Sequence, residues 1–422
     1  MKLAPLFVLL IAGAIAVPAL SNPLGAHVVN GSASFNQSGN VLTVTNSNGA
    51  IINWNKFSIA AGETTQFNQP SASSSVLNRV MGDPTVIYGT LSSNGHVWLI
   101  NPSGIMIGAG GRIDTAGFVA STLHVSDIDF LAGRHIFVEG GTASNTIINQ
   151  GEITTPPGGS VYLVGANVAN EGVITTPQGE AILAAGATVS LSDTAPPGVR
   201  VDITGSAGDS TNLGTITAEA GNIVMAGVNV RNSGLLTANN INITSGQGVL
   251  VTGEGAITAT GDMVINAGSD ITVTGVVSGG SVTLTSNGGV TLPGETATGG
   301  NLTLTGGSIA VTRSHAGAGS VTIGSGNIVI AGSSSGGSLS LTSGRLAVPA
   351  ETRKLLQQTA GSIALRGAPS ILASAPTPPP ASTPPALRAS APAARLVNTG
   401  NLVDGAVTVR LSLVDAAPIS LR

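Results

Sequence analysis

The sequence predicts an all-β protein: a right-handed parallel β-helix (solenoid) with an aromatic-rich N-terminal cap and a Pro-rich, disordered C-terminal region. Three observations predict this fold. Short segments repeat every 18 to 21 residues, 59 of the 422 residues are glycine while only 9% are charged, and the aromatic residues are confined to the N-terminal part. A composition rich in glycine and β-branched residues favours many short strands joined by tight turns over helical bundles.

The repeat is clearest in two segments that are offset by 21 residues, NQGEITTPPGGSVYLVG (149–165) and NEGVITTPQGEAILAAG (170–186). After an irregular insertion the pattern returns at 212–227 and 232–246, and a more degenerate series follows. Each unit contains short strands with Gly or Asn at the corners, which fits one coil of a β-helix. A propeller blade would instead repeat at about 40 residues.

Alternation within the repeats predicts the core. Val282 and Leu284 in one coil, and Leu302 and Leu304 in the next, are expected to point inward and stack, while the intervening Thr and Ser face water. The spacing predicts about sixteen coils between residues 22 and 345, a rod about 75 Å long at about 4.8 Å per coil.

The aromatic residues predict a distinct N-terminal cap, because all of them lie at or before Tyr162. An open solenoid end exposes unpaired strand edges and apolar core, so it needs a cap of different composition. The side chains expected to fill this N-terminal third are Trp54, Phe57, Phe67, Trp98, Phe118, Phe130 and Phe137.

One short stretch is more particular than the rest: LSSNGHVWLINPSGIMIGAGG, residues 91–111. It predicts a tight Asn-Pro-Ser-Gly turn between two apolar runs, since Pro presets φ and Gly supplies a positive φ. Two interpretations stay open for this turn. It either locks the fold or contacts a partner directly, and both roles are compatible.

Residues 48–123 carry a family resemblance. The stretch NGAIINWNKFSIAAGETTQFNQPSASSSVLNRVMGDPTVIYGTLSSNGHVWLINPSGIMIGAGGRIDTAGFVAST resembles the N-terminal secretion domain of two-partner-secretion exoproteins, the filamentous-haemagglutinin-like proteins, and is most similar to the high-molecular-weight adhesin type. The family's Asn-Pro-Asn-Gly-Ile motif matches Asn101, Pro102, Ser103, Gly104 and Ile105, with Ser103 in place of the second Asn. The family's second motif, Asn-Pro-Asn-Leu, has no clear copy; FNQPSASSSVLNRV (67–80) stands in that stretch.

The resemblance implies a role and a partner. Such a passenger is exported through the inner membrane, recognised by an outer-membrane β-barrel transporter with periplasmic POTRA modules, and released from or kept on the surface of a Gram-negative bacterium. The implied function is that of a monomeric, adhesin-like rod that binds host or bacterial surface glycans without catalysis. Some high-molecular-weight adhesins are glycosylated at Asn-x-Ser/Thr sequons, which makes Asn30, Asn36, Asn242 and Asn301 weak candidates for modification.

The chain is expected to divide into six parts. An apolar run behind a single Lys, ending in small residues, is typical of a secretory signal peptide and is shorter than the about 20 residues of a membrane span. The predicted parts are the signal peptide (1–21), the secretion domain (22–245), degenerate β-helix repeats (246–345), a short helix and linker (346–367), a Pro-rich spacer (368–395) and a short C-terminal strand segment (396–422).

Other functions are disfavoured by the composition. A net charge of −4 with scattered Lys and Arg argues against nucleic-acid binding. Five histidines without ligand spacing, and no cysteine, indicate no metal site, and no cofactor is expected.

Two alternative classes remain. A polysaccharide-active β-helix enzyme would need clustered carboxylates; Asp127 and Asp129 are expected to share one strand face beside His124, and we interpret them as a solvated loop or edge strand. The other alternative is a truncated contact-dependent-inhibition exoprotein without its toxin domain. The sequence therefore favours a protein that is not an enzyme.

Overall fold

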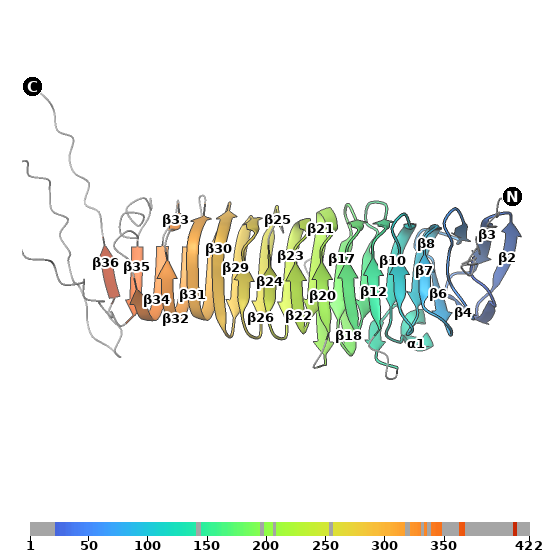
Figure 1. Ribbon diagram of the computed structural model, residues 1–422, viewed down its shortest axis with the longest axis horizontal. Helices are drawn as coiled ribbons and strands as arrows, with labels where there is room; N and C mark the ends of the chain where they lie inside the picture. The colour runs from blue at the N-terminus through green and yellow to red at the C-terminus, as the bar shows by residue number, and fades with distance from the viewer. Residues whose placement is uncertain are drawn as a thin grey trace, which may run out of the picture.

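The computed structural model is an elongated rod of stacked β-coils (Figure 1). The residues that the structure describes are 22–140, 145–194, 198–205, 208–252, 256–316, 321–330, 333–335, 339–347, 363–367 and 408–411. The predicted signal peptide (1–21), the predicted helix at 349–358 and the Pro-rich spacer (368–395) lie outside these residues.

The rod is a parallel β-solenoid with three faces, and each face is a column of strands that pair in parallel with the strand one coil away. The first face contains β4 (Ala50–Trp54), β6 (Ser75–Val80), β14 (Val161–Gly165), β17 (Glu180–Ala185), β26 (Asp262–Ala267), β29 (Ser281–Ser286) and β35 (Ile363–Gly367). The second contains β3 (Val41–Asn46), β5 (Thr64–Asn68), β13 (Glu152–Thr154), β16 (Val173–Thr175), β25 (Ala256–Ala259), β28 (Val276–Gly279) and β33 (Ser333–Ser335). The third contains β7 (Thr85–Ile87), β9 (Ile105–Ile107), β12 (Thr146–Asn149), β15 (Asn167–Asn170), β20 (Asp209–Asn212), β22 (Asn229–Asn232), β24 (Val249–Val251) and β27 (Ile271–Val273).

Longer strands continue round a corner and contribute to more than one face. These are β8 (Thr90–Ile100), β10 (Arg112–Ser121), β21 (Thr215–Gly227), β23 (Leu235–Ser245), β30 (Gly289–Thr298), β31 (Leu302–Ala316), β32 (Val321–Ile330) and β34 (Leu339–Ala347). The ladder runs on across residue 245, because β23 pairs with β26 of the next coil. The predicted domain limits stay predictions.

The core follows the predicted alternation. Val282, Leu284, Leu302 and Leu304 are fully buried, and Val282 pairs in register with Leu302. The solenoid has about 12 turns, so the expectation of sixteen was too high. Residues 27–38 form antiparallel strands that precede the regular coils, and two later segments form a lobe outside the coils. Dividing the chain length by the repeat length therefore overestimates the number of coils.

The cap closes the N-terminal end of the rod with antiparallel strands. β1 (His27–Asn30) pairs with β4, and β2 (Ala33–Ser38) forms a hairpin with β3. Phe35 of the hairpin meets Trp54 edge-on at 5.5 Å between ring centroids, and Trp54 meets Phe57 at 5.6 Å. Of the aromatic residues predicted for the N-terminal third, Trp54, Phe57, Phe67 and Phe118 belong to the solenoid core.

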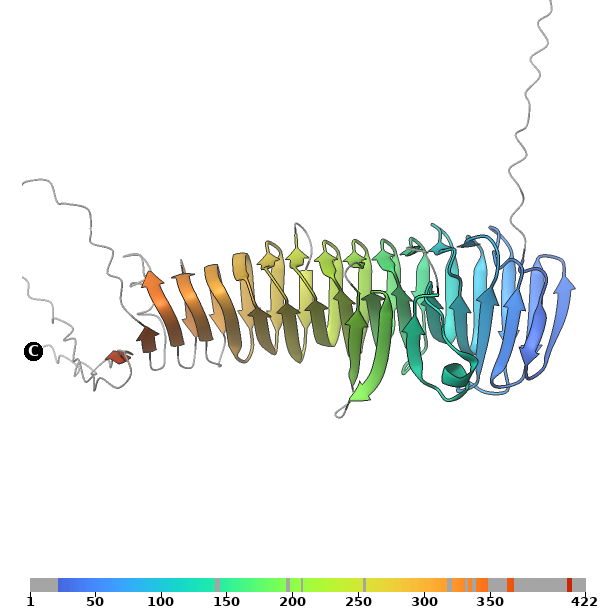
Figure 2. The same cartoon turned by 90° about the horizontal axis from the view of Figure 1, so that it is seen from below.

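The other aromatic residues build a second core outside the coils. A lobe formed by α1 (Asp127–Leu131), β11 (His135–Val138), β18 (Thr188–Thr194) and β19 (Gly198–Thr204) packs on the outer side of the first face. In Figure 2 it projects from the lower side of the rod. Phe137 stacks on Trp98 at 5.9 Å, and Phe130 meets the same indole edge-on at 5.3 Å. These buried rings fasten the lobe to the solenoid.

The C-terminal strand segment contributes β36 (Thr408–Leu411), which pairs antiparallel with β35. Among the described residues, no helix has the length and apolarity needed to span a bilayer.

Candidate functional site

The Asn101–Ile105 corner joins β8 on the first face to β9 on the third. The backbone N–H of Gly104 donates to the carbonyl of Asn101 at 3.0 Å and closes a four-residue turn. Gly104 has φ of +115°, a backbone conformation that residues with a Cβ rarely adopt. The turn that the sequence predicts is therefore present, with Pro and Gly in the roles expected of them.

The Asn101 side chain is fully buried and satisfies three polar groups. Its Nδ2 donates to the Asp83 carbonyl at 3.0 Å and to Thr85 Oγ1 at 2.9 Å, and both partners lie in the preceding coil. Its Oδ1 accepts from the backbone N–H of Ser103 at 2.9 Å. The side chain thus locks its own turn and fastens it to the coil before.

The other turn residues extend this fastening in both directions along the rod. Ser103 Oγ donates to the Gly82 carbonyl of the preceding coil at 2.8 Å. In the opposite direction, Asn145 Nδ2 donates to the Pro102 carbonyl. Ile105 is buried between its neighbours Thr85 and Ile147 in the third face. Five motif residues therefore hold three successive coils, and Asn145, which the sequence reasoning missed, is one of their partners.

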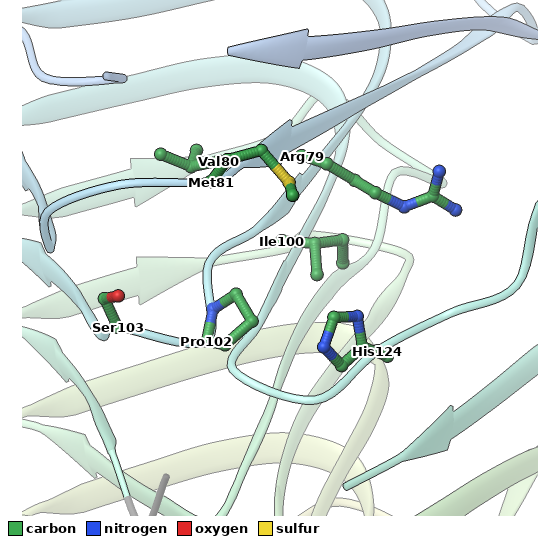
Figure 3. A pocket seen from close by; sticks show the side chains of 7 residues that line it. All are labelled: Arg79, Val80, Met81, Ile100, Pro102, Ser103 and His124. Carbon is green, nitrogen blue, oxygen red and sulfur yellow. The ribbon is translucent and has the colours of Figure 1, made fainter. Parts of the chain in front are cut away.

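A small pocket of about 230 Å³ opens beside the turn, lined by Arg79, Val80, Met81, Ile100, Pro102, Ser103 and His124. Figure 3 shows Met81 and Arg79 along one side and Pro102 and His124 along the other. Met81 is exposed, whereas Arg79 is largely covered because it donates to the Val125 carbonyl at 2.8 Å and pairs with Asp127. The walls are mainly apolar.

The prediction that Asp127 and Asp129 share a strand face is wrong, because both lie in α1. Ser126 is the N-cap of this helix, and Asp129 N–H donates to its Oγ at 3.0 Å, a side chain-to-backbone bond that favours the start of a helix. A hydrogen bond from Ser126, followed by one from Arg134, lowers the pKa of the Asp129 carboxyl. Asp127 pairs with Arg79. Asp127 thus ties α1 to the solenoid, whereas Asp129 makes contacts within the lobe. The described residues contain no cluster of three or more metal-ligating side chains.

The second face carries two in-register columns of outward side chains that the sequence reasoning did not single out. One column is a run of hydroxyls formed by Thr154, Thr175, Thr217, Thr237, Thr258 and Ser278. Two residues earlier on each strand, the neighbouring column begins with Glu152 and continues with Val173, Thr215, Leu235, Ala256 and Val276. Val173, Leu235 and Val276 expose 42%, 40% and 52% of their surface. The signal was present in the sequence, as the Thr at the centre of each ITT, ITA or LTA triplet.

The four sequon asparagines, Asn30, Asn36, Asn242 and Asn301, are all exposed. The amide of Asn30 is engaged with the Gly49 carbonyl at 2.9 Å. Their glycosylation stays a prediction.

The comparisons with known proteins identify the family. Residues 19–265 match the family model described as the TPS (two-partner secretion) secretion domain, and the chain belongs to this family. Its exoproteins are secreted across the outer membrane of Gram-negative bacteria. The solved HMW1 secretion domain from Haemophilus influenzae superimposes with a TM-score of 0.57 and 30% identity, over 82% of this chain and 100% of that one.

Two curated relatives are similar over shorter stretches. A heme/hemopexin-binding protein from Haemophilus influenzae is 31% identical over 179 residues, 36% of this chain and 20% of the relative. A second protein of that name from the same species is 32% identical over 103 residues, 24% of this chain and 11% of the relative. The chain thus spans a fifth or less of the length of these relatives. The resemblance predicted from residues 48–123 is confirmed.

Proposed function

We propose that this protein is the passenger of a two-partner secretion system, that an outer-membrane β-barrel transporter recognises its N-terminal domain, and that the rod binds glycans or cell surfaces without catalysis. We further propose that the Asn101–Ile105 corner supports export by holding the first coils together. Family membership supports the secretion role. The observation that supports the role of the corner is the buried Asn101 side chain, which donates two hydrogen bonds to the preceding coil and accepts one within its own turn.

The experiment for the corner is an immunoblot of culture supernatant, cell surface and periplasm, in the native host, for the wild-type chain and Asn101→Ala. We expect wild type outside the cell and the variant retained or degraded in the periplasm. The matched control is Leu284→Ala, a fully buried core residue of β29 whose truncation costs about 2–5 kcal/mol. Equal loss of export in both variants would reduce the corner's role to general stability.

The surface-binding role is supported by the two columns on the second face. Between Val173 and Val276 these columns contain hydroxyls and aliphatic groups and no charged side chain. Hydroxyls one coil apart, about 4.8 Å, next to a row of exposed aliphatic groups, suit an uncharged, extended partner that has both hydrogen-bonding and apolar surfaces. A neutral polysaccharide is such a partner.

Binding to immobilised neutral polysaccharides tests this role. Leu235→Asp should weaken binding at least about tenfold, because an unpaired charge would have to lose water on contact. Thr244→Asp is the control, since Thr244 is an exposed residue of the same strand, β23, but lies on the first face. Equal binding by wild type and Leu235→Asp would overturn the assignment of this face.

The names of the curated relatives describe whole proteins of which this chain matches a fifth or less, so heme or hemopexin binding is not carried over. Exoproteins of this family are typically non-catalytic adhesins or binding proteins, in keeping with the structural contacts of Asp127 and Asp129. We propose a monomer, and size-exclusion chromatography with light scattering tests that state.

A further inference from the structure

Four consecutive strands of the third face carry a buried asparagine at the same inward position. They are Asn149, Asn170, Asn212 and Asn232, each exposed by no more than 1%. In the coil before them this position is Ile107, and in the coil after them it is Val251. The column is therefore aliphatic on both sides and amide-bearing only in these coils.

The four side chains form one directional ladder. Asn149 Nδ2 donates to Asn170 Oδ1 at 2.7 Å, Asn170 Nδ2 to Asn212 Oδ1 at 2.8 Å, and Asn212 Nδ2 to Asn232 Oδ1 at 2.8 Å. The last amide, Asn232 Nδ2, ends the ladder on the Gly234 carbonyl at 3.0 Å. Because each group is removed from water, breaking the ladder leaves buried polar atoms unpaired.

The ladder lies where the lobe interrupts the coils. The chain leaves the rod after β10 to form α1 and β11, and leaves it again after β17 to form β18 and β19 (Figure 2). It returns on β12 and on β20, and these two strands end at Asn149 and Asn212. Both points of return are thus marked by a ladder asparagine.

The second point of return has no hydrophobic pattern. β20 reads Asp-Ser-Thr-Asn, and its inward residues are Ser210 and Asn212, both fully buried. In most strands the choice of inward aliphatic residues specifies which residues pair with the neighbouring coil. Here hydrogen bonds must do so. The buried ones come from Asn212 and from Ser210 Oγ, which donates to the Leu183 carbonyl at 3.1 Å, and exposed ones join Asp209 to Asn167 and Asn229.

We propose that this asparagine ladder sets the register in which the chain rejoins the solenoid after each lobe insertion. A slip of β20 by two residues would keep its inward face inward but would move Asn212 out of line with Asn170. The ladder would then break in the middle, and two buried amides would lose their partners. In the coils before and after the ladder, this position is aliphatic, and a slip would be disfavoured by the loss of core packing alone. Neither lobe insertion interrupts the chain in those coils.

The chain contains no cysteine, so engineered pairs can report register directly. Ala169 lies opposite Thr211 in the native ladder, and Ala169→Cys with Thr211→Cys reports the native register. Ala169→Cys with Asp209→Cys reports a two-residue slip, since that pair lies about 8 Å apart in the native register, too far to form a disulfide. The full-length chain is denatured, refolded and then oxidised.

With the ladder intact, we expect the native pair to form a disulfide and the slipped pair to stay reduced. With all four asparagines replaced by valine, the residue type found at Val251, we expect the slipped disulfide in at least about a tenth of the molecules and a refolding yield lowered about threefold or more. The matched control replaces Thr175, Thr217, Thr237 and Thr258 on the second face by valine, and should behave as wild type.

Asn212→Val alone is the second variant. It should raise the unfolding equilibrium constant about 10- to 100-fold, because Asn170 Nδ2 loses its ladder acceptor and Asn232 Oδ1 loses its donor in the buried core. It should also show the same slipped disulfide. Native-only disulfides in both the fourfold and the single variant, with unchanged refolding yield, would overturn the proposal. So would equal slippage in the threonine control.

Discussion

Replacing Asn101 by alanine tests how the secretion-motif corner is stabilised. The change removes two donated hydrogen bonds, to the Asp83 carbonyl and Thr85 Oγ1, and one accepted from the Ser103 N–H. Because Asn101 and Thr85 are both fully buried, water cannot replace these bonds. A buried polar group left unpaired costs about 1–3 kcal/mol, so we expect the variant to lose about 2–5 kcal/mol of stability in the N-terminal coils.

Urea unfolding followed by the fluorescence of Trp54 and Trp98 measures this loss, since both indoles lie in the N-terminal coils. Ser103→Asn, which introduces the residue that the family motif carries, is the control and should change stability by less than about 1 kcal/mol. A free energy of unfolding for Asn101→Ala within about 0.5 kcal/mol of wild type would refute the reasoning, because it would mean that the buried hydrogen bonds contribute nothing.

Three further outcomes are expected. Phe137→Ala should destabilise the lobe by about 3–5 kcal/mol, and limited proteolysis should then cut first within 124–138; an unchanged digestion pattern would contradict the aromatic anchor. Burial lowers the pKa of His96 below its ordinary value of 6.5, so the free energy of unfolding should be highest above pH 6.5, fall as the pH drops towards the folded-state pKa and level off below it. His96→Gln should flatten this pH dependence, and equal slopes in both proteins would contradict the prediction. The lowered pKa of Asp129 means that its contribution is present above pH 3.8 and lost as the pH falls through the folded value; hydrogen exchange in α1 should quicken there in wild type but not in Asp129→Asn.

Much of the fold is readable from the sequence because a solenoid repeats local rules. The alternation at Val282 and Leu284 places these residues in the core, and the 21-residue offset between 149–165 and 170–186 becomes the register of β13 with β16. The lobe was missed because it is built from two insertions that are far apart in the sequence. The first insertion forms α1 and β11, and the second forms β18 and β19. The antiparallel pairing of β11 with β18 and the packing of aromatic rings on Trp98 bring them together. The cap signal at Ser126 was overlooked, although a Ser three residues before an Asp is a helix-start pattern.

The site shows the same division between local and long-range information. Pro102 and Gly104 predict the turn, because their backbone preferences act within the motif itself. The partners of Asn101 in the preceding coil, and Asn145 in the following one, are set by which residues the coil path brings together. No pattern within residues 91–111 contains that information. The residues of the hydroxyl column and of the asparagine ladder were visible in the repeats. Which of them lie opposite one another in neighbouring coils could be seen only in the structure.

The central claim is that the chain is a two-partner-secretion passenger, and its location in the native host tests this most directly. Intact cells treated with an external protease, together with culture supernatant and a periplasmic extract, are probed with an antibody against the rod. We expect the protein in the supernatant or in a protease-sensitive form on the cell surface. A protein confined to the periplasm and protected from the protease would contradict it.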